Sequence, residues 1–123
     1  MKRPLSPDLS IYKLDMSAIM SISHRISGVI LFLGTAGLLK LLLILAFFPS
    51  LWPLSAWFLK LWIFQGIMMF YAAALFYHCF NGLRHMIWDL GFGFDKKHVK
   101  ATGFAVLAAT LFSTILFWRA IYA

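Results

Sequence analysis

Two histidines, an arginine and an aspartate occur in the stretch FYHCFNGLRHMIWD, which ends a long apolar run. At 100° per residue, Gly82, His85 and Asp89 lie within about 40° of His78 on a helix and form one polar stripe with it. Arg84 marks the end of the uncharged run, and His78 lies about 9 Å deeper than this residue. An imidazole at that depth needs partners for its ring nitrogens.

Three roles fit His78: a hydrogen bond to another helix, membership of a proton relay, or ligation of a metal, above all haem iron. Gly82 favours haem, because a missing side chain one turn away leaves a slot for a flat macrocycle. His85 and Arg25 would then suit the haem propionates as cationic or hydrogen-bonding groups. The signature C-x-x-C-H of covalent haem is absent, so the expected group is a non-covalent haem b.

The other histidines are poor candidates for a second axial ligand. His24 and His85 are nearer the surface, and His98 belongs to a basic segment. A haem with two axial histidines would therefore take the second one from a partner chain.

A second polar cluster begins the first apolar run, SAIMSISHRISGV. Ser21, Arg25 and Gly28 share a helix face, and His24 is adjacent. Arg25 alone is explained as a cationic anchor at the membrane surface. Together, the Ser21 hydroxyl and the Arg25 guanidinium could also hold the carbonyl oxygens of a quinone, with His24 or water helping to deliver protons.

Membrane helices must position these side chains. The chain is 63% hydrophobic and 12% charged, with a mean hydropathy of +0.87, too apolar for a small soluble domain. Three long apolar runs predict an all-α membrane protein with transmembrane helices near 22–46, 58–88 and 100–121. We expect one transmembrane domain over 1–123, preceded by a cytoplasmic segment over 1–21.

The charge distribution predicts the orientation. Lys and Arg total 11 against four aspartates, and they cluster at the N-terminus and in the segment LGFGFDKKHVK, whereas FFPSLWPLSAW has no charge. The N-terminus is therefore expected in the cytoplasm and the C-terminus on the opposite side. Because the basic residues flank apolar runs, membrane topology explains them, and we expect no nucleic-acid partner.

The opening residues lack a signal peptide or transit pattern, so we expect either a bacterial protein or one whose presequence has been removed, and a bacterial inner membrane is favoured over a mitochondrial one. Three helices cannot enclose a cofactor and exclude lipid on all sides, so we expect partner subunits in the bilayer. The single cysteine, Cys79, cannot ligate an iron–sulfur cluster, so any reaction that needs such clusters would belong to other chains.

The stretches RPLSPDLSIY, SISHRISG and HCFNGLRHMIWD, in this order, resemble the cytochrome b556 membrane-anchor (C) subunit of succinate dehydrogenase, respiratory complex II. The resemblance implies a second small anchor subunit, a flavoprotein and an iron–sulfur protein as partners. It also implies a haem b held by one histidine from each anchor, with His78 as this chain's ligand, and ubiquinone as the electron acceptor.

The resemblance further assigns Ser21 and Arg25 to the quinone site, where we also place Ile22. Residues matching His24 and His85 lie near the propionates and the quinone, and Gly82 belongs to the same surroundings. Asp89 is expected to pair with a basic group or, failing that, to serve a proton path.

Two alternatives remain at this point. A related fumarate reductase anchor would carry electrons the other way, and a purely structural anchor would use His78 for a hydrogen bond alone.

Overall fold

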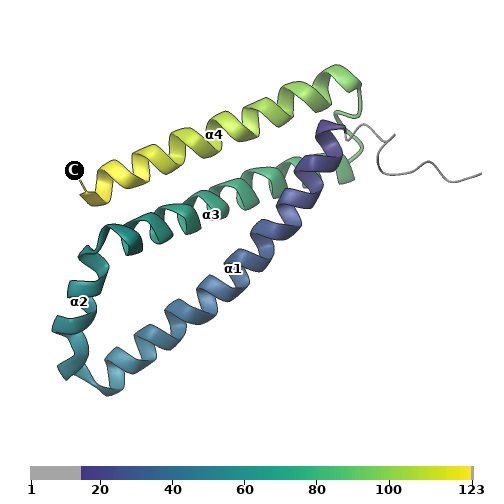
Figure 1. The fold of residues 1–123 in the computed structure, drawn as a ribbon. Coiled ribbons are helices and arrows are strands. Elements are labelled where there is room, and N and C mark those ends of the chain that lie inside the picture. The colour runs from purple at the N-terminus through teal and green to yellow at the C-terminus, as the bar shows by residue number, and fades with distance from the viewer. Residues whose placement is uncertain (1–14, 123) are drawn as a thin grey trace, which may run out of the picture.

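The structure, a computed structural model, describes residues 15–122, and every regular element in this range is helical. The elements, in chain order, are α1 (Met16–Phe47), the 3₁₀ turn η1 (Pro49–Leu51), α2 (Trp52–Lys60), α3 (Trp62–Asp89) and α4 (Lys96–Tyr122) (Figure 1). Three of them, α1, α3 and α4, are long and apolar enough to cross a membrane. This confirms the predicted all-α fold with three candidate spans.

Helix α1 begins earlier than the sequence predicted. Asp15 is its N-cap, with Oδ1 accepting a hydrogen bond from the Met16 backbone N–H at 2.9 Å and Oδ2 accepting one from the Ser17 hydroxyl at 3.1 Å. The carboxylate also lies at the positive end of the helix dipole. Residues 16–21, expected in the N-terminal segment, are therefore helical, whereas residues 1–14 of that segment lie outside the described residues.

The second predicted helix, 58–88, is two helices in the structure. Helix α2 ends at Lys60, Leu61 is extended (φ −66°, ψ 134°), and α3 starts at Trp62. The Gln65 side chain donates to the Lys60 carbonyl at 3.4 Å, which satisfies one of the acceptors left free at the end of α2. Leu61 is neither proline nor glycine, so the break gave no local signal in the sequence.

Two glycines end α3 before the basic segment that begins α4. Gly91 has φ +87° and Gly93 has φ +82°, the left-handed region that side chains disfavour. The Gly91 N–H bonds the Trp88 carbonyl at 2.8 Å, and the Phe92 N–H bonds the Ile87 carbonyl at 3.3 Å.

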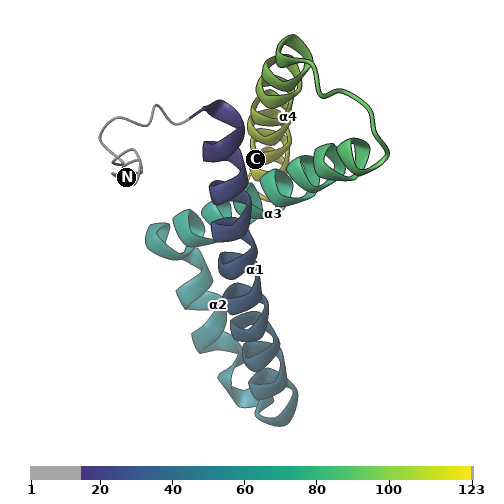
Figure 2. The same cartoon turned by 90° about the vertical axis from the view of Figure 1, so that its right-hand side faces the viewer.

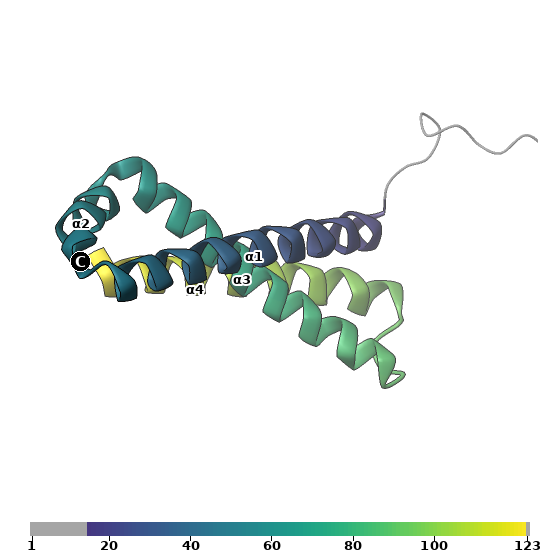
Figure 3. The same cartoon turned by 90° about the horizontal axis from the view of Figure 1, so that it is seen from below.

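The long helices converge at one end and separate at the other. Helices α3 and α4 run antiparallel and side by side, and α1 meets both of them where α1 begins, α3 ends and α4 begins (Figure 1). Away from that end α1 diverges, and α2 bridges the widening gap to α3 (Figures 1 and 2). Seen from below, α3 crosses α1 at an angle (Figure 3). We call the meeting point the convergent end.

Among the described residues, as many polar as apolar side chains are buried. Ser27, Asn81, Arg84 and Thr114 are buried together with Met20, Ala72, Ala74 and Val106. Large apolar side chains lie outside instead, and Phe47 and Trp62 are 77% and 79% exposed. This distribution is typical of a helix bundle whose apolar surface faces lipid or neighbouring subunits.

Candidate functional site

Two histidines from different helices meet near the convergent end. The imidazoles of His24 on α1 and His78 on α3 are stacked, with ring centroids 4.0 Å apart and planes inclined by 18°. The rings approach because Gly28 leaves room on α1, where an added Cβ would lie 3.2 Å from His78 Cε1. The structure thus joins residues of the two polar clusters that the sequence identified separately.

The two nitrogens of His78 have different surroundings. Its Nδ1 lies 3.0 Å from the Ser27 hydroxyl and 3.2 Å from the His24 backbone carbonyl, and that hydroxyl itself donates to the same carbonyl at 2.7 Å. Its Nε2 makes no hydrogen bond with any residue between 15 and 122. No buried side-chain nitrogen or oxygen in that range lacks a partner, so Nε2 remains accessible from outside the chain.

Gly82 contacts His24 instead of leaving an empty slot beside His78. A Cβ at residue 82 would lie 3.6 Å from His24 Nε2, and this nitrogen donates a hydrogen bond to the His78 carbonyl at 3.1 Å. A Cβ at this distance would be in ordinary van der Waals contact, so Gly82 lies beside His24 but is not required for its hydrogen bond to α3. The glycine that lies against the His78 ring is Gly28.

His85 continues the row of imidazoles toward the end of α3. Its ring centroid lies 5.4 Å from that of His24, and its edge meets the ring of Trp88 at a centroid distance of 5.1 Å. The remaining histidine, His98, lies apart in the first turn of α4, with Nδ1 3.4 Å from Asp95 Oδ2. The structure thus brings His78, His24 and His85 together and leaves His98 outside the group.

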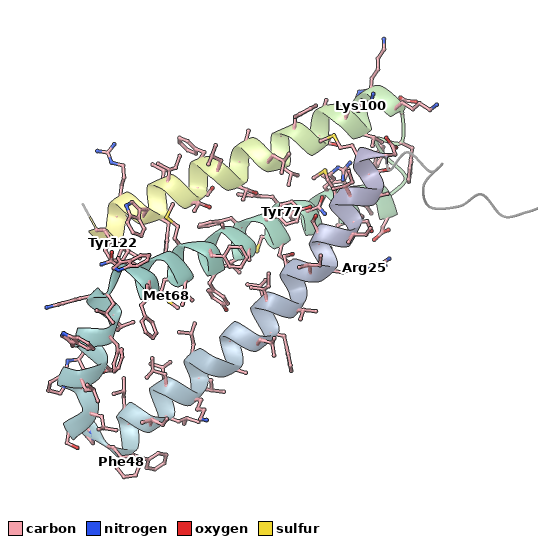
Figure 4. All side chains as sticks on the ribbon, in the orientation of Figure 1. Arg25, Phe48, Met68, Tyr77, Lys100 and Tyr122 are labelled. Atoms are coloured by element: carbon pink, nitrogen blue, oxygen red, sulfur yellow. The ribbon has the colours of Figure 1, made fainter. Side chains whose placement is uncertain are left out.

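The residues considered for quinone binding lie on the outer side of α1. Ile22 and Arg25 are exposed and Ser21 is half-buried, and the Ser21 and Arg25 side chains form no hydrogen bond within the described chain. Figure 4 shows Arg25 projecting from α1 away from α3 and α4. Asp89, the last residue of α3, is exposed and forms no ion pair within residues 15–122.

A buried polar network holds the three helices together at the convergent end. Asn81 is fully buried, and its amide nitrogen donates to the Met20 carbonyl of α1 at 3.3 Å. Arg84, 4% exposed, donates to Asn81 Oδ1 at 3.3 Å, to Thr102 Oγ1 at 3.1 Å and to the Val99 carbonyl of α4 at 3.0 Å. The Arg84 guanidinium also lies 4.0 Å from the centroid of Trp88.

Sequence reasoning missed this network because it treated Arg84 as a mark of the membrane boundary. The available signal was Asn81, an amide three residues before Arg84 on the same helix face, since spacing of three places two side chains in contact. Sequence reasoning also assigned no role to Ser27, whose hydroxyl contacts His78.

No group of three or more histidine, cysteine, aspartate or glutamate side chains that could hold a metal ion occurs within residues 15–122. An axial position on haem iron requires a single imidazole with a free nitrogen, which is what His78 offers. Cys79 is a free, exposed thiol on the neighbouring position of α3.

The fold and the site define a membrane subunit with three apolar helices, built around a pair of histidines in contact between two of them. The chain belongs to the succinate dehydrogenase/fumarate reductase transmembrane subunit family, whose sequence model matches residues 1–117.

Curated relatives agree with this family over most of their length. The chain is 40% identical over 117 residues to a succinate dehydrogenase cytochrome b556 subunit of Rickettsia felis, covering 95% of this chain and 91% of that protein. It is 38% identical over 120 residues to a cytochrome b560 subunit of the same enzyme in Chondrus crispus, with coverage of 95% and 93%. For the cytochrome b560 subunit of Reclinomonas americana the identity is 35% over 121 residues, with coverage of 94% and 84%.

Proposed function

We propose that this chain is the membrane-anchoring cytochrome b subunit of a succinate:quinone oxidoreductase. It supplies one axial ligand of a haem b and part of a ubiquinone site, so that electrons from succinate reach the quinone pool. Succinate oxidation itself takes place in partner subunits. The observation that carries the proposal is the state of His78, whose Nδ1 is hydrogen-bonded inside the chain while Nε2 is free.

The residues around His78 fit a haem. An axial imidazole binds iron through one nitrogen and is oriented by a hydrogen bond at the other. Ser27 and the His24 carbonyl provide that hydrogen bond, and His24 covers a face of the His78 ring instead of the Nε2 edge. When bound, the haem would supply a one-electron redox centre in the bilayer.

The second axial ligand comes from another polypeptide. His24 Nε2 donates to the His78 carbonyl, and His85 packs on Trp88, so both imidazoles have partners within this chain and a haem held by His78 would take its second histidine from another one. The exposed apolar surface of α1 supports a second anchor subunit as the partner that completes the site.

Ser21, Ile22 and Arg25 form this chain's part of the quinone site. The Arg25 guanidinium and the Ser21 hydroxyl are free to donate hydrogen bonds to a quinone carbonyl, and the exposed Ile22 offers an apolar surface to its ring. Donors placed at these oxygens stabilise the negative charge that develops as the ring is reduced. Because these side chains face outward, the other wall of the site belongs to partner subunits.

His24, His85, Gly82 and Arg25 form the surroundings of the haem propionates. His85 and the exposed Arg25 offer hydrogen-bond donors there, whereas His24 Nε2 donates to the His78 carbonyl and Gly82 lies beside it. Asp89, exposed at the end of α3, pairs with a cation of a partner subunit or contributes to a proton path.

The convergent end faces the cytoplasm, where a flavoprotein and an iron–sulfur protein dock. The lysines that begin α4 and Arg25 gather at this end, which the distribution of positive charge assigns to the cytoplasmic side. The membrane is the bacterial inner membrane, in agreement with the Rickettsia relatives; relatives in eukaryotes leave a mitochondrial inner membrane as the alternative.

The name of the family covers fumarate reductase as well, and an anchor of that enzyme is the second candidate function. The relatives named above are all succinate dehydrogenase subunits, which favours the first. Identifying the quinone that copurifies with the complex separates the two, because menaquinone favours fumarate reduction and ubiquinone succinate oxidation.

The test is the reduced-minus-oxidised absorption spectrum of the purified complex. A b-type band is expected in the wild type and in His98→Ala, whose imidazole is exposed on α4, and its loss is expected in His78→Ala. A band that survives His78→Ala unchanged contradicts the assignment of the ligand. A wild-type complex with all subunits and no b-type band leaves only a structural anchor.

A further inference from the structure

We propose that Ser27 is a positioning residue that fixes the tautomer of His78 and strengthens its Nε2 as a ligand. This inference rests on the proposed function, in which His78 binds haem iron. Ser27 lies on α1 between His24 and Gly28, the two residues that pack against His78, and is 5% exposed.

The hydrogen-bond geometry selects one tautomer of His78. Three polar atoms form a closed triangle: His78 Nδ1, Ser27 Oγ and the His24 carbonyl oxygen, separated by 3.0, 2.7 and 3.2 Å. The Ser27 hydroxyl proton goes to the carbonyl, because that contact is the shortest. With a proton on Nδ1, His78 donates to both oxygens of the triangle.

The opposite tautomer is disfavoured in the same place. Without a proton, the Nδ1 lone pair would face the carbonyl oxygen of His24 at 3.2 Å, and Ser27 has a single proton to share between them. If the hydroxyl stays on the carbonyl, Nδ1 lacks a donor, and if it turns to Nδ1, the lone pairs of Nδ1 and the carbonyl still face each other; both arrangements are costly. The Nδ1–H form leaves the lone pair on Nε2, at the accessible edge of the ring.

Packing prevents the imidazole from escaping this arrangement by rotation. His24 covers one face at a centroid distance of 4.0 Å, and Gly28 lies so close that a Cβ there would be 3.2 Å from His78 Cε1. The imidazole of His78, a residue of α3, is therefore held in place by three residues of α1: His24, Ser27 and Gly28.

The hydrogen bond from Nδ1–H makes His78 a stronger electron donor at Nε2. Partial transfer of the Nδ1 proton toward Ser27 and the carbonyl gives the imidazole some imidazolate character. Such a ligand stabilises ferric over ferrous iron and lowers the reduction potential of the haem. Ser27 thus sets a redox property of the site without contacting iron.

The experiment compares Ser27→Ala, Ser27→Thr and Ser23→Ala in the assembled complex. Ser23 lies one turn earlier on α1, and its hydroxyl makes no hydrogen bond with His78, so it is a matched serine-to-alanine control. Redox titration of the b-type band gives the midpoint potential, and the electron paramagnetic resonance spectrum of the oxidised haem reports the donor strength of its axial imidazoles.

Ser27→Ala is expected to raise the midpoint potential. The equilibrium constant for reduction should rise several-fold, up to about tenfold, and a tenfold rise corresponds to about 59 mV for one electron. Its resonance spectrum should shift toward weaker imidazole donation. Ser27→Thr keeps the hydroxyl and should stay near the wild type, as should Ser23→Ala. Loss of the band in Ser27→Ala but not in Ser27→Thr also supports the proposal, since the hydroxyl is then needed to orient the ligand.

The proposal is overturned if Ser27→Ala titrates like Ser23→Ala and the wild type. It is also overturned if Ser27→Ala and Ser27→Thr both lose the band, because the site would then require the size of serine and not its hydroxyl. These outcomes are separate from failure of the proposed function, which is judged by the wild-type and His78→Ala spectra.

Discussion

The imidazole of His24 lies flat against that of His78. Its Nε2 also donates a hydrogen bond of 3.1 Å to the backbone carbonyl of His78. One side chain of α1 therefore contacts both the ring and the main chain of a single α3 residue. Gly82 lies beside His24 Nε2, and the absence of a side chain at Gly28 leaves room for the His78 ring. The pair fixes the rotation of α3 relative to α1 at the depth where the proposed haem ligand lies.

Ser21→Ala and Arg25→Ala are each expected to lower quinone reduction by about tenfold or more, since each removes a donor to a developing negative charge. Succinate oxidation with a soluble artificial acceptor should remain, because it does not require the membrane site. Arg119→Ala, at the other end of the chain in the last turn of α4, is the matched control. Parallel loss of both activities would mean failed assembly and would contradict a quinone role.

Gly34→Ala is expected to destabilise the subunit, because the added Cβ would collide with the ring of Tyr71 on α3. Overpacking of this kind costs about 1–3 kcal/mol. Gly37→Ala, three residues along the same helix, meets nothing within 4 Å and should be neutral or slightly stabilising. Thermal denaturation of the detergent-solubilised complex measures both; equal stability of the two variants would contradict the packing described for Gly34.

The Tyr71 and Thr35 hydroxyls form a hydrogen bond of 2.7 Å between α3 and α1. A double-mutant cycle of Tyr71→Phe and Thr35→Val should give a coupling free energy of about 0.6 kcal/mol, the average for such bonds in membrane helices. The free energies of unfolding in mixed micelles provide the four values. Additive effects of the two substitutions would show that the bond contributes nothing to stability.

Arg84→Met is expected to reduce the free energy of unfolding by about 1–3 kcal/mol, because it leaves the buried Asn81 Oδ1 without its donor and removes the bonds from α3 to Thr102 and Val99. Arg84→Lys should rescue little, since an ammonium cannot reach the same three acceptors with the geometry of a guanidinium. The exposed Arg119 again serves as control, in Arg119→Met. If Arg84→Met and Arg119→Met melt alike, the network does not hold the convergent end together.

The sequence by itself determined the number of membrane spans, the glycine-rich end of α3 and the polar stripe that contains His78. Each depends on interactions within one segment: the hydropathy of a run, the conformational freedom of Gly91 and Gly93, and the 100° step of a helix. These remain the same whichever way the helices pack.

Only the tertiary structure decided that Ser27 and Gly28, and not Gly82, lie against His78. It also decided that Arg84 is buried between α3 and α4. The break of the second predicted helix at Leu61 likewise became visible only in the structure. These features depend on how far one helix is rotated and shifted along another. Packing of side chains from distant parts of the chain sets those two quantities, and no periodicity within a single helix encodes them.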